Sequence, residues 1–155
     1  MDTKSLLKSL NHHKVRFVII GGNAVIAHGF VRATQDIDIF VAPTQENMEK
    51  TFKALGACGY DLMGMTIDEA LTKKMLFRGY ILRTDIHPFV TGIDFETLWK
   101  NKIQLIFQEE EVYFSSLDDL IVMKKAAGRP QDQEDLRHLE EIKRQLKEKN
   151  RASKN

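Results

Sequence analysis

The segment from Phe17 to Phe40 constrains the fold of this chain more than any other part of the sequence. It begins with the apolar run Phe17–Ile20, continues with the glycine pair Gly21-Gly22 and ends with the alternating run Asp36–Phe40. The short apolar run predicts a buried strand, and the glycine pair predicts a sharp turn after it. Because successive strand residues point to opposite faces, the alternating run predicts a second strand with one acidic and one apolar face.

The acidic face of this second strand has the properties of a cation site. Asp36 and Asp38 lie on it about 6–7 Å apart at the backbone, and at an effective dielectric of about 20 their charges repel by about 2.5 kcal/mol. A divalent cation removes this repulsion, and oxygen ligands favour Mg²⁺ or Mn²⁺, which bind carboxylates together with substrate phosphates. The glycine turn offers backbone N–H groups to a phosphate at the start of a short helix, expected from Ala24 to His28. The sequence therefore predicts a metal-dependent nucleotide site.

These residues resemble the signature of the polymerase-beta-like nucleotidyltransferase superfamily. The resemblance is to the small bacterial branch with abortive-infection and toxin–antitoxin nucleotidyltransferases and, more distantly, lincosamide-modifying enzymes. It rests on Gly22, Ala24, His28, Gly29, Arg32, Thr34 and Asp36 to Ile39. Many members have Gly-Ser where this chain has Gly21-Gly22, so a serine hydroxyl for the triphosphate is missing. The resemblance implies an α/β (α+β) nucleotidyltransferase fold, with a small mixed β-sheet flanked by helices and two C-terminal helices.

The resemblance also implies two metal ions and a third carboxylate on a later strand, where it would orient the attacking hydroxyl. Asp85 is the candidate, because alternation within Tyr80–His87 places it on one face together with Arg83. Neighbouring strands lie about 4.8 Å apart, so Asp85 can reach a cation held by the first two aspartates. The alternative is a surface acid beside Arg83.

Four residues are the candidates for nucleotide binding: Gly21, Gly22, Arg32 and Lys124. Lys124 lies beside the buried stripe of a helix expected to open at Ser116, and the run from Arg129 to Asp135 after it resembles the same branch. There, Asp132 and Asp135 would support Lys124 or Arg129. The alternatives are a surface lysine, a salt-bridged Arg32, and acids that stabilise a helix N-terminus.

Other parts of the chain predict the elements that complete the domain. Helices are expected over Asp2–His12, from Pro43 to about Leu55, after Thr66 or Asp68, over Asp94–Lys100, from Ser116 to Ala127 and from Pro130 onward. Strands are expected early in Tyr60–Arg78, and over Met75–Arg78, Ile103–Phe107 and Val112–Phe114. The last helix carries an apolar stripe that predicts packing to about Leu146.

Length and composition predict one domain with a real core. The chain has 155 residues, of which 43% are hydrophobic and 29% charged. We expect a single minimal nucleotidyltransferase domain over residues 1–148 and a basic, frayed tail over residues 149–155. No apolar run approaches the length of a membrane span, so we expect a cytoplasmic protein without membrane contact. Cys58 is the single cysteine, which excludes an internal disulfide.

The leading hypothesis is transfer of a nucleoside monophosphate from a nucleoside triphosphate to a hydroxyl. The acceptor is open among a protein, a tRNA and a small molecule, and recognition by a homodimer or a partner protein is expected for so small a domain. A toxin–antitoxin or defence role follows from resemblance alone. Two alternatives are a catalytically silent nucleotide- or partner-binding module of the same fold, and a glycosyltransferase, since Asp-x-Asp also serves nucleotide sugars.

Overall fold

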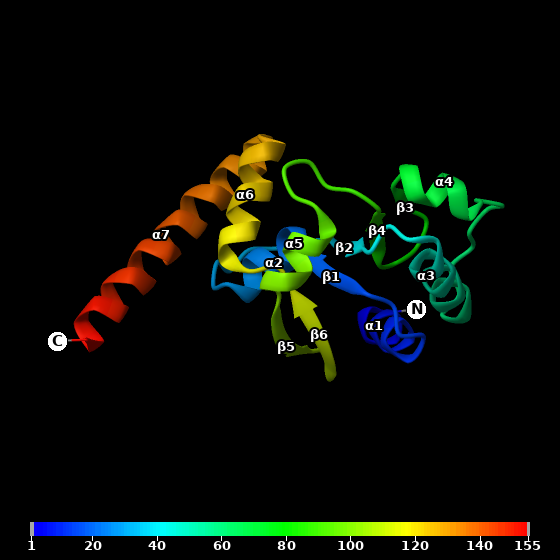
Figure 1. Ribbon diagram of the computed structural model, residues 1–155, viewed down its shortest axis with the longest axis horizontal. Coiled ribbons are helices and arrows are strands. Elements are labelled where there is room, and N and C mark those ends of the chain that lie inside the picture. The colour runs from blue at the N-terminus through cyan, green and yellow to red at the C-terminus, as the bar shows by residue number, and fades with distance from the viewer. Residues whose placement is uncertain (1, 155) are drawn as a thin grey trace.

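One mixed sheet forms the centre of the computed structural model, which describes residues 2–154 (Figure 1). Within these residues the sheet has six strands in the order β3-β4-β2-β1-β6-β5. Strand β2 is antiparallel to β1 and parallel to β4, β1 is parallel to β6, and the outer pairs β3/β4 and β5/β6 are antiparallel. The strands are β1 (Phe17–Ile20), β2 (Asp36–Val41), β3 (Met75–Phe77), β4 (Arg83–His87), β5 (Ile103–Phe107) and β6 (Glu110–Phe114). The predicted mixed sheet is confirmed.

Helices flank this sheet, and the last two follow each other at the C-terminal end, as predicted. They are α1 (Thr3–His12), α2 (Gly21–Ala27), α3 (Gln45–Ala57), α4 (Ile67–Thr72), α5 (Phe95–Asn101), α6 (Leu117–Ala127) and α7 (Pro130–Ser153). Side-chain caps explain where most of these helices begin. In each cap a side-chain oxygen accepts a hydrogen bond from the backbone N–H three residues later, and the capping residues are Asp2, Thr44, Thr66, Asp94 and Ser116. None of the helices in the described part of the chain has the length and apolar composition that crossing a bilayer requires.

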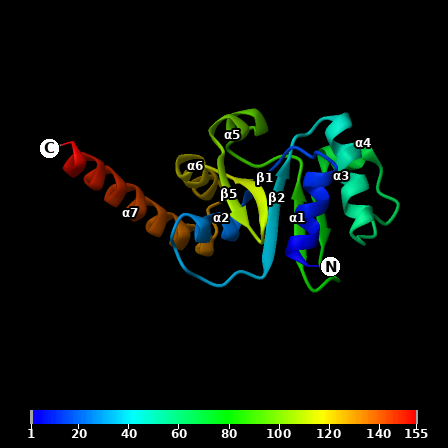
Figure 2. The same ribbon diagram turned by 90° about the horizontal axis from the view of Figure 1, so that it is seen from below.

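The helices form two groups on either side of the central strands. Helices α1 and α3 pack on each other and reach strands β6 and β2, whereas α6 packs on α7 and touches α2. Figure 2 shows the first group beside β2 and away from α6 and α7. Leu7 of α1, Ile39 of β2 and Leu120 of α6 are fully buried, so the core extends through both groups.

Strand β2 has the two faces that its alternating sequence predicts. Ile37 and Ile39 are buried, whereas Asp36 and Asp38 are half-buried. The apolar face therefore belongs to the core, and the acidic face remains accessible for chemistry.

Two local predictions were wrong. The helix expected from Ala24 begins at Gly21, so the turn and the helix start coincide. The short strand expected early in Tyr60–Arg78 is absent from the described residues, because Met63 and Gly64 both have positive φ angles and the segment turns instead of extending.

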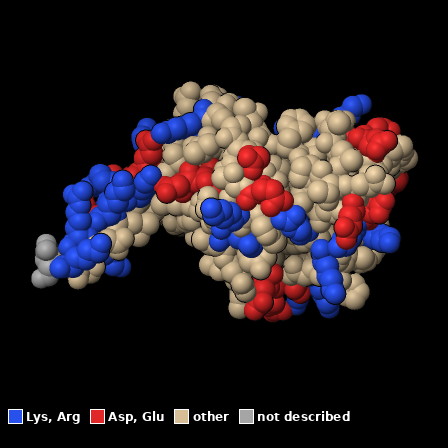
Figure 3. All heavy atoms as spheres, viewed as in Figure 1, with Lys and Arg blue, Asp and Glu red and all other residues tan. Residues whose placement is uncertain are grey.

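The end of α7 also differs from the prediction, because Leu146 is 49% exposed instead of packed. Helix α7 has 24 residues and its partner α6 only 11. Lys143 of α7 still pairs with Asp118 of α6, and α7 extends about ten residues beyond this contact. It projects from the body in Figures 1 and 2, and Figure 3 shows lysine and arginine side chains along it. The helix continues to Ser153 through the basic segment that begins at Lys149.

Candidate active site

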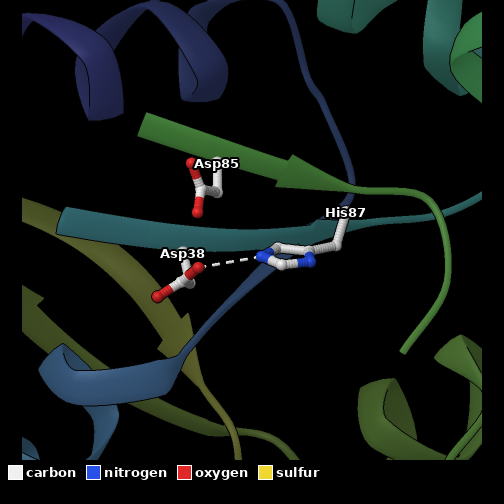
Figure 4. Close-up of side chains that lie close together, drawn as sticks. All are labelled: Asp38, Asp85 and His87. Atoms are coloured by element: carbon white, nitrogen blue, oxygen red, sulfur yellow. Dashed lines mark hydrogen bonds and ion pairs between the residues drawn. The ribbon is translucent and has the colours of Figure 1, made fainter. Parts of the chain in front are cut away.

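Two carboxylates from neighbouring strands meet on the accessible face of the sheet. The parallel register of β2 and β4 places Asp38 directly beside Asp85, and residues at the same register position of parallel strands point to the same face. His87 lies two residues further along β4 and shares that face. One ligand atom from each of Asp38, Asp85 and His87 lies within 4.8 Å of the others (Figure 4).

His87 holds one of these carboxylates in place. Its Nε2 lies 2.8 Å from Oδ1 of Asp38, a contact drawn in Figure 4, and the imidazole is 9% exposed. A hydrogen bond of this kind fixes the orientation of a carboxylate and leaves Oδ2 of Asp38 free for another ligand.

Asp36 lies on the same face but two register positions away from the pair of Asp38 and Asp85. It is paired with Arg83, whose Nε lies 3.3 Å from Oδ1 of Asp36. That oxygen is buried and has no hydrogen bond of good geometry among the described residues. The structure thus brings Asp38 and Asp85 together and leaves Asp36 beside them with one unsatisfied oxygen.

The glycine turn is built against the same carboxylates. Gly21 has φ +69°, and a Cβ atom there would lie 2.4 Å from Oδ2 of Asp38. A Cβ on Gly22 would lie 2.8 Å from Oγ1 of Thr34 and 2.9 Å from the guanidinium of Arg32. Both positions therefore exclude a side chain, because the start of α2 approaches the acidic strand and the Arg32–Thr34 segment closely.

A cleft of about 950 Å³ contains all of the predicted site residues. Asp36, Asp38 and Asp85 line its floor, and Gly21, Gly22, Arg32 and Lys124 line one wall. Lys74, Arg78 and the segment from Phe89 to Thr91 also line the cleft. The sheet, α2, α6 and the start of α7 thus enclose one site.

A buried network of ions forms the wall beside the glycine turn. The Nζ of Lys124 lies 3.1 Å from Asp132 and 3.0 Å from Asp135. Asp135 also binds Nε of Arg32 at 2.8 Å, and Asp132 binds Nε of Arg129 at 2.7 Å. The contacts predicted for the two aspartates are confirmed, and they join α6, α7 and the segment before β2.

This network keeps its carboxylates ionised. Burial opposes ionisation, but hydrogen bonds from Arg129 and Lys124 outweigh it and lower the pKa of Asp132. Burial likewise opposes ionisation of Asp135, and bonds from Lys124 and Arg32 lower its pKa. Lys124 is 7% exposed and bound to both acids, whereas the side chain of Arg129 is 76% exposed.

The third carboxylate has a cationic partner of its own. Both oxygens of Asp85 accept hydrogen bonds from the guanidinium of Arg78, one of them at 3.0 Å, and this contact raises the pKa of Arg78. Arg78 begins the loop between β3 and β4, and its side chain is 40% exposed.

Sequence reasoning assigned no role to His87 or Arg78. A signal for His87 existed, because its position two residues after Asp85 places it on the same strand face. Arg78 gave no such signal, since its contact with Asp85 depends on the register of β3 against β4.

The donor set suits a hard divalent cation. Carboxylate oxygens select Mg²⁺ or Mn²⁺, and Oδ2 of Asp38 is available as a ligand. Oδ1 of Asp36 is buried beside Arg83 without a hydrogen bond of good geometry. The imidazole of His87 is a less suitable donor for Mg²⁺, and its hydrogen bond to Asp38 is the role that fits.

Comparisons with known proteins agree with this geometry. The sequence model of a family described as "Nucleotidyltransferase of unknown function (DUF6036)" matches residues 2–147. Among solved structures, the lincomycin-bound crystal structure of the lincosamide antibiotic adenylyltransferase LnuA is similar, with a TM-score of 0.61 and 20% identity. The match covers 92% of this chain and 98% of that one, and it shows a shared fold. No curated protein matches the chain in sequence.

Proposed function

Because the chain belongs to this family of nucleotidyltransferases, we propose that it catalyses metal-dependent transfer of a nucleoside monophosphate to a hydroxyl group. The oxygen of the acceptor hydroxyl forms a bond to the α-phosphorus of a nucleoside triphosphate. The bond from that phosphorus to the bridging oxygen breaks, and pyrophosphate leaves with the electron pair. The proton of the hydroxyl passes to a carboxylate of the site.

The observation that carries this proposal is the register of β2 and β4. It sets Asp38 beside Asp85 on an accessible sheet face, where a divalent cation can bind to both carboxylates. The glycine turn packs against the same carboxylate of Asp38. A cation site and a phosphate-binding turn in contact with each other are what nucleotidyl transfer requires.

Each carboxylate has a role in the proposed reaction. Asp36 and Asp38 hold the metal, Mg²⁺ or Mn²⁺, and Asp85 completes the site for a second ion. Bound divalent ions stabilise the charge on the attacking and leaving oxygens. Asp85 also accepts the proton of the attacking hydroxyl, and His87 orients Asp38 through Oδ1.

The wall beside the glycine turn binds the triphosphate in this proposal. Backbone N–H groups near Gly21 and Gly22, together with Arg32 and Lys124, surround the β- and γ-phosphates. Three cations and two acids in the ionic network leave one net positive charge on this wall. Because Lys124 is bound to both acids, it acts as a fixed charge at the base of the cleft, while Arg129 is the exposed cation at its rim.

The proposal also includes the class of the acceptor and the biological role of the enzyme. LnuA is a lincosamide adenylyltransferase, so a small hydroxyl compound is one acceptor class, and a protein or a tRNA are the others. The resemblance to small bacterial enzymes supports a toxin–antitoxin or defence role in the cytoplasm, with a homodimer or a partner protein that completes acceptor recognition.

The second candidate is a catalytically silent module that binds a nucleotide or a partner. The contact between Arg78 and Asp85 favours it, because a guanidinium neutralises the third carboxylate. This candidate predicts magnesium-dependent triphosphate binding without turnover. A glycosyltransferase is disfavoured, since the family match covers most of the chain.

Label transfer tests the proposal. The protein is incubated with Mg²⁺, with each nucleoside triphosphate labelled at the α-phosphorus, and with a cell extract as the source of acceptors. We expect label on one acceptor class from wild type, and none from Asp38→Asn or after chelation of the metal. The matched control is Asp61→Asn, an exposed aspartate outside the cleft, which should transfer label as wild type does. Equal labelling by wild type and Asp38→Asn contradicts the proposal.

A further inference from the structure

We propose that the acceptor carries a phosphate group next to its reactive hydroxyl, and that Arg78 and Lys74 at the β3 edge of the cleft bind this phosphate. The inference rests on the proposed function, because it assigns the acceptor side of the same site. It goes further in naming the chemical class of the acceptor and the residues that recognise it.

The acceptor side follows from the order of the strands. The glycine turn comes directly after β1, whereas β3 lies at the far end of the β3-β4-β2-β1 series. At about 4.8 Å per strand, β3 lies about 14 Å from β1, with Asp85 and Asp38 on the two strands between them. In an in-line displacement the attacking and leaving oxygens lie on opposite sides of the phosphorus. If the triphosphate lies against the glycine turn, the acceptor therefore approaches from β3.

Two cations stand on that approach. Leu76 of β3 pairs with Asp85, so residues 74, 76 and 78 share the face of the sheet that carries the carboxylates. Lys74 and Arg78 line the cleft, and Leu76 between them is 55% exposed. The β3 edge thus presents a cation on each side of an apolar residue.

Both cations have the capacity to bind an anion. Lys74 is exposed and forms no ion pair within the described residues, and the carboxylate that Arg78 contacts there is Asp85. Once Asp85 serves as a metal ligand, its charge is compensated and the guanidinium is free to turn to another anion. A guanidinium binds phosphate through two parallel hydrogen bonds, and a lysine adds a mobile point charge.

An aromatic side chain that lines the same cleft suits the rest of such an acceptor. Phe89 lines the cleft beyond His87 and is 52% exposed. An exposed ring accepts the face of a nucleic-acid base or the apolar face of a sugar. A phosphate beside a hydroxyl occurs both at the 3′ end of a nucleic acid and in small phosphorylated sugars. The shared chemistry is the phosphate, and the experiment separates the two sources.

Binding to the loaded protein tests the inference. The protein with Mg²⁺ and a non-hydrolysable ATP analogue is titrated with three probes: a short fluorescent single-stranded RNA, ribose 5-phosphate and ribose. We expect at least one phosphorylated probe to bind and ribose not to bind. If only the RNA binds, the acceptor is the end of a nucleic acid. If ribose 5-phosphate binds, the acceptor is a small sugar phosphate.

Matched variants locate the binding. Lys74→Glu and Arg78→Gln should each lower the affinity for the phosphorylated probe about ten-fold or more. This is the loss of affinity expected when a charged hydrogen bond is removed. Lys73→Glu is the control, because Lys73 is equally exposed but does not line the cleft. Lys147→Glu with Arg151→Glu tests whether RNA binds to the projecting end of α7 instead.

The outcomes separate this inference from the proposed function. If no phosphorylated probe binds, if ribose binds as well as ribose 5-phosphate, or if only the α7 variant weakens binding, the inference is overturned. Magnesium-dependent binding of the ATP analogue, measured in the same samples, tests the proposed function by itself. If the analogue binds and no phosphorylated probe binds, the inference about the acceptor is overturned and the proposed function is not.

Discussion

Gly21, at the start of α2, lies close against Asp38 of β2: a Cβ atom on Gly21 would lie 2.4 Å from Oδ2 of Asp38. Real Cβ atoms do not approach an oxygen so closely, and the φ of +69° at Gly21 also disfavours a side chain. The glycine therefore permits two things at once, the left-handed turn and the approach of the helix start to a site carboxylate.

Gly21→Ala should destabilise the protein by more than about 1 kcal/mol, because alanine strains at positive φ and displaces Asp38. Urea unfolding measures the loss. Gly56→Ala is the matched control in the last turn of α3, where a Cβ would meet nothing within 4 Å. That control should keep or gain stability, by less than about 1 kcal/mol. Equal stability changes at the two positions would show that the turn is not constrained.

His87→Ala should weaken Mn²⁺ binding about 10–100-fold while the fold remains intact, because Asp38 loses the hydrogen bond that orients it. Electron paramagnetic resonance of free Mn²⁺ measures the affinity. His12→Ala, at the exposed end of α1, is the control and should bind Mn²⁺ as wild type does. Unchanged binding in His87→Ala would remove the positioning role.

Asp135→Asn should lower the free energy of unfolding by about 3–5 kcal/mol, because it leaves Lys124 and Arg32 without one of their buried counterions. Glu141→Gln removes an exposed ion pair on the same helix and should cost less than about 1 kcal/mol. Thermal unfolding compares the two variants. Similar losses would mean that the network does not stabilise the fold.

The same variant has a predicted pH dependence. The pKa of Asp135 is lowered from its ordinary value of 3.8, so its stabilising charge is fully present above that value. The contribution disappears as the pH falls through the lower pKa of the folded protein. The stability difference between wild type and Asp135→Asn should therefore stay constant above about pH 5 and shrink in more acidic solution. A constant difference down to the acid limit would contradict the pKa shift.

Tyr60 should titrate late in alkaline solution. Burial raises its pKa from 10.0 to about 12, while its hydroxyl is hydrogen-bonded to Thr84 at 2.7 Å. Because the folded state holds the proton more tightly, stability from this group is present below pH 10 and disappears as the pH rises towards 12. Tyr60→Phe should flatten this alkaline loss, which unfolding at several pH values measures. An unchanged alkaline slope would contradict the shift.

The sequence predicted those parts of the site that depend on local periodicity. Alternation in Asp36–Phe40 predicted the acidic face of β2, and the caps Thr66 and Ser116 predicted helix starts. These features depend on neighbouring residues, whose geometry a strand or a helix start fixes.

Features that depend on strand register were out of reach. The register that sets Asp38, and not Asp36, beside Asp85 is a property of two strands with two helices and another strand between them in the sequence. The contact of Arg78 with Asp85 likewise depends on the register of β3 against β4. The exposure of Leu146 depends on the length of α6 compared with α7, a difference that the apolar stripe of α7 does not contain.

The central claim is that Asp38, together with Asp36 and Asp85, holds the metal ions that bind a nucleoside triphosphate. Calorimetric titration with a non-hydrolysable ATP analogue tests it most directly, with Mg²⁺ and with a chelator. We predict that the analogue binds only when Mg²⁺ is present. Its affinity should fall about ten-fold or more in Asp38→Asn and in Asp85→Asn. Binding that is equally tight in the chelator, or in both variants, would contradict the claim.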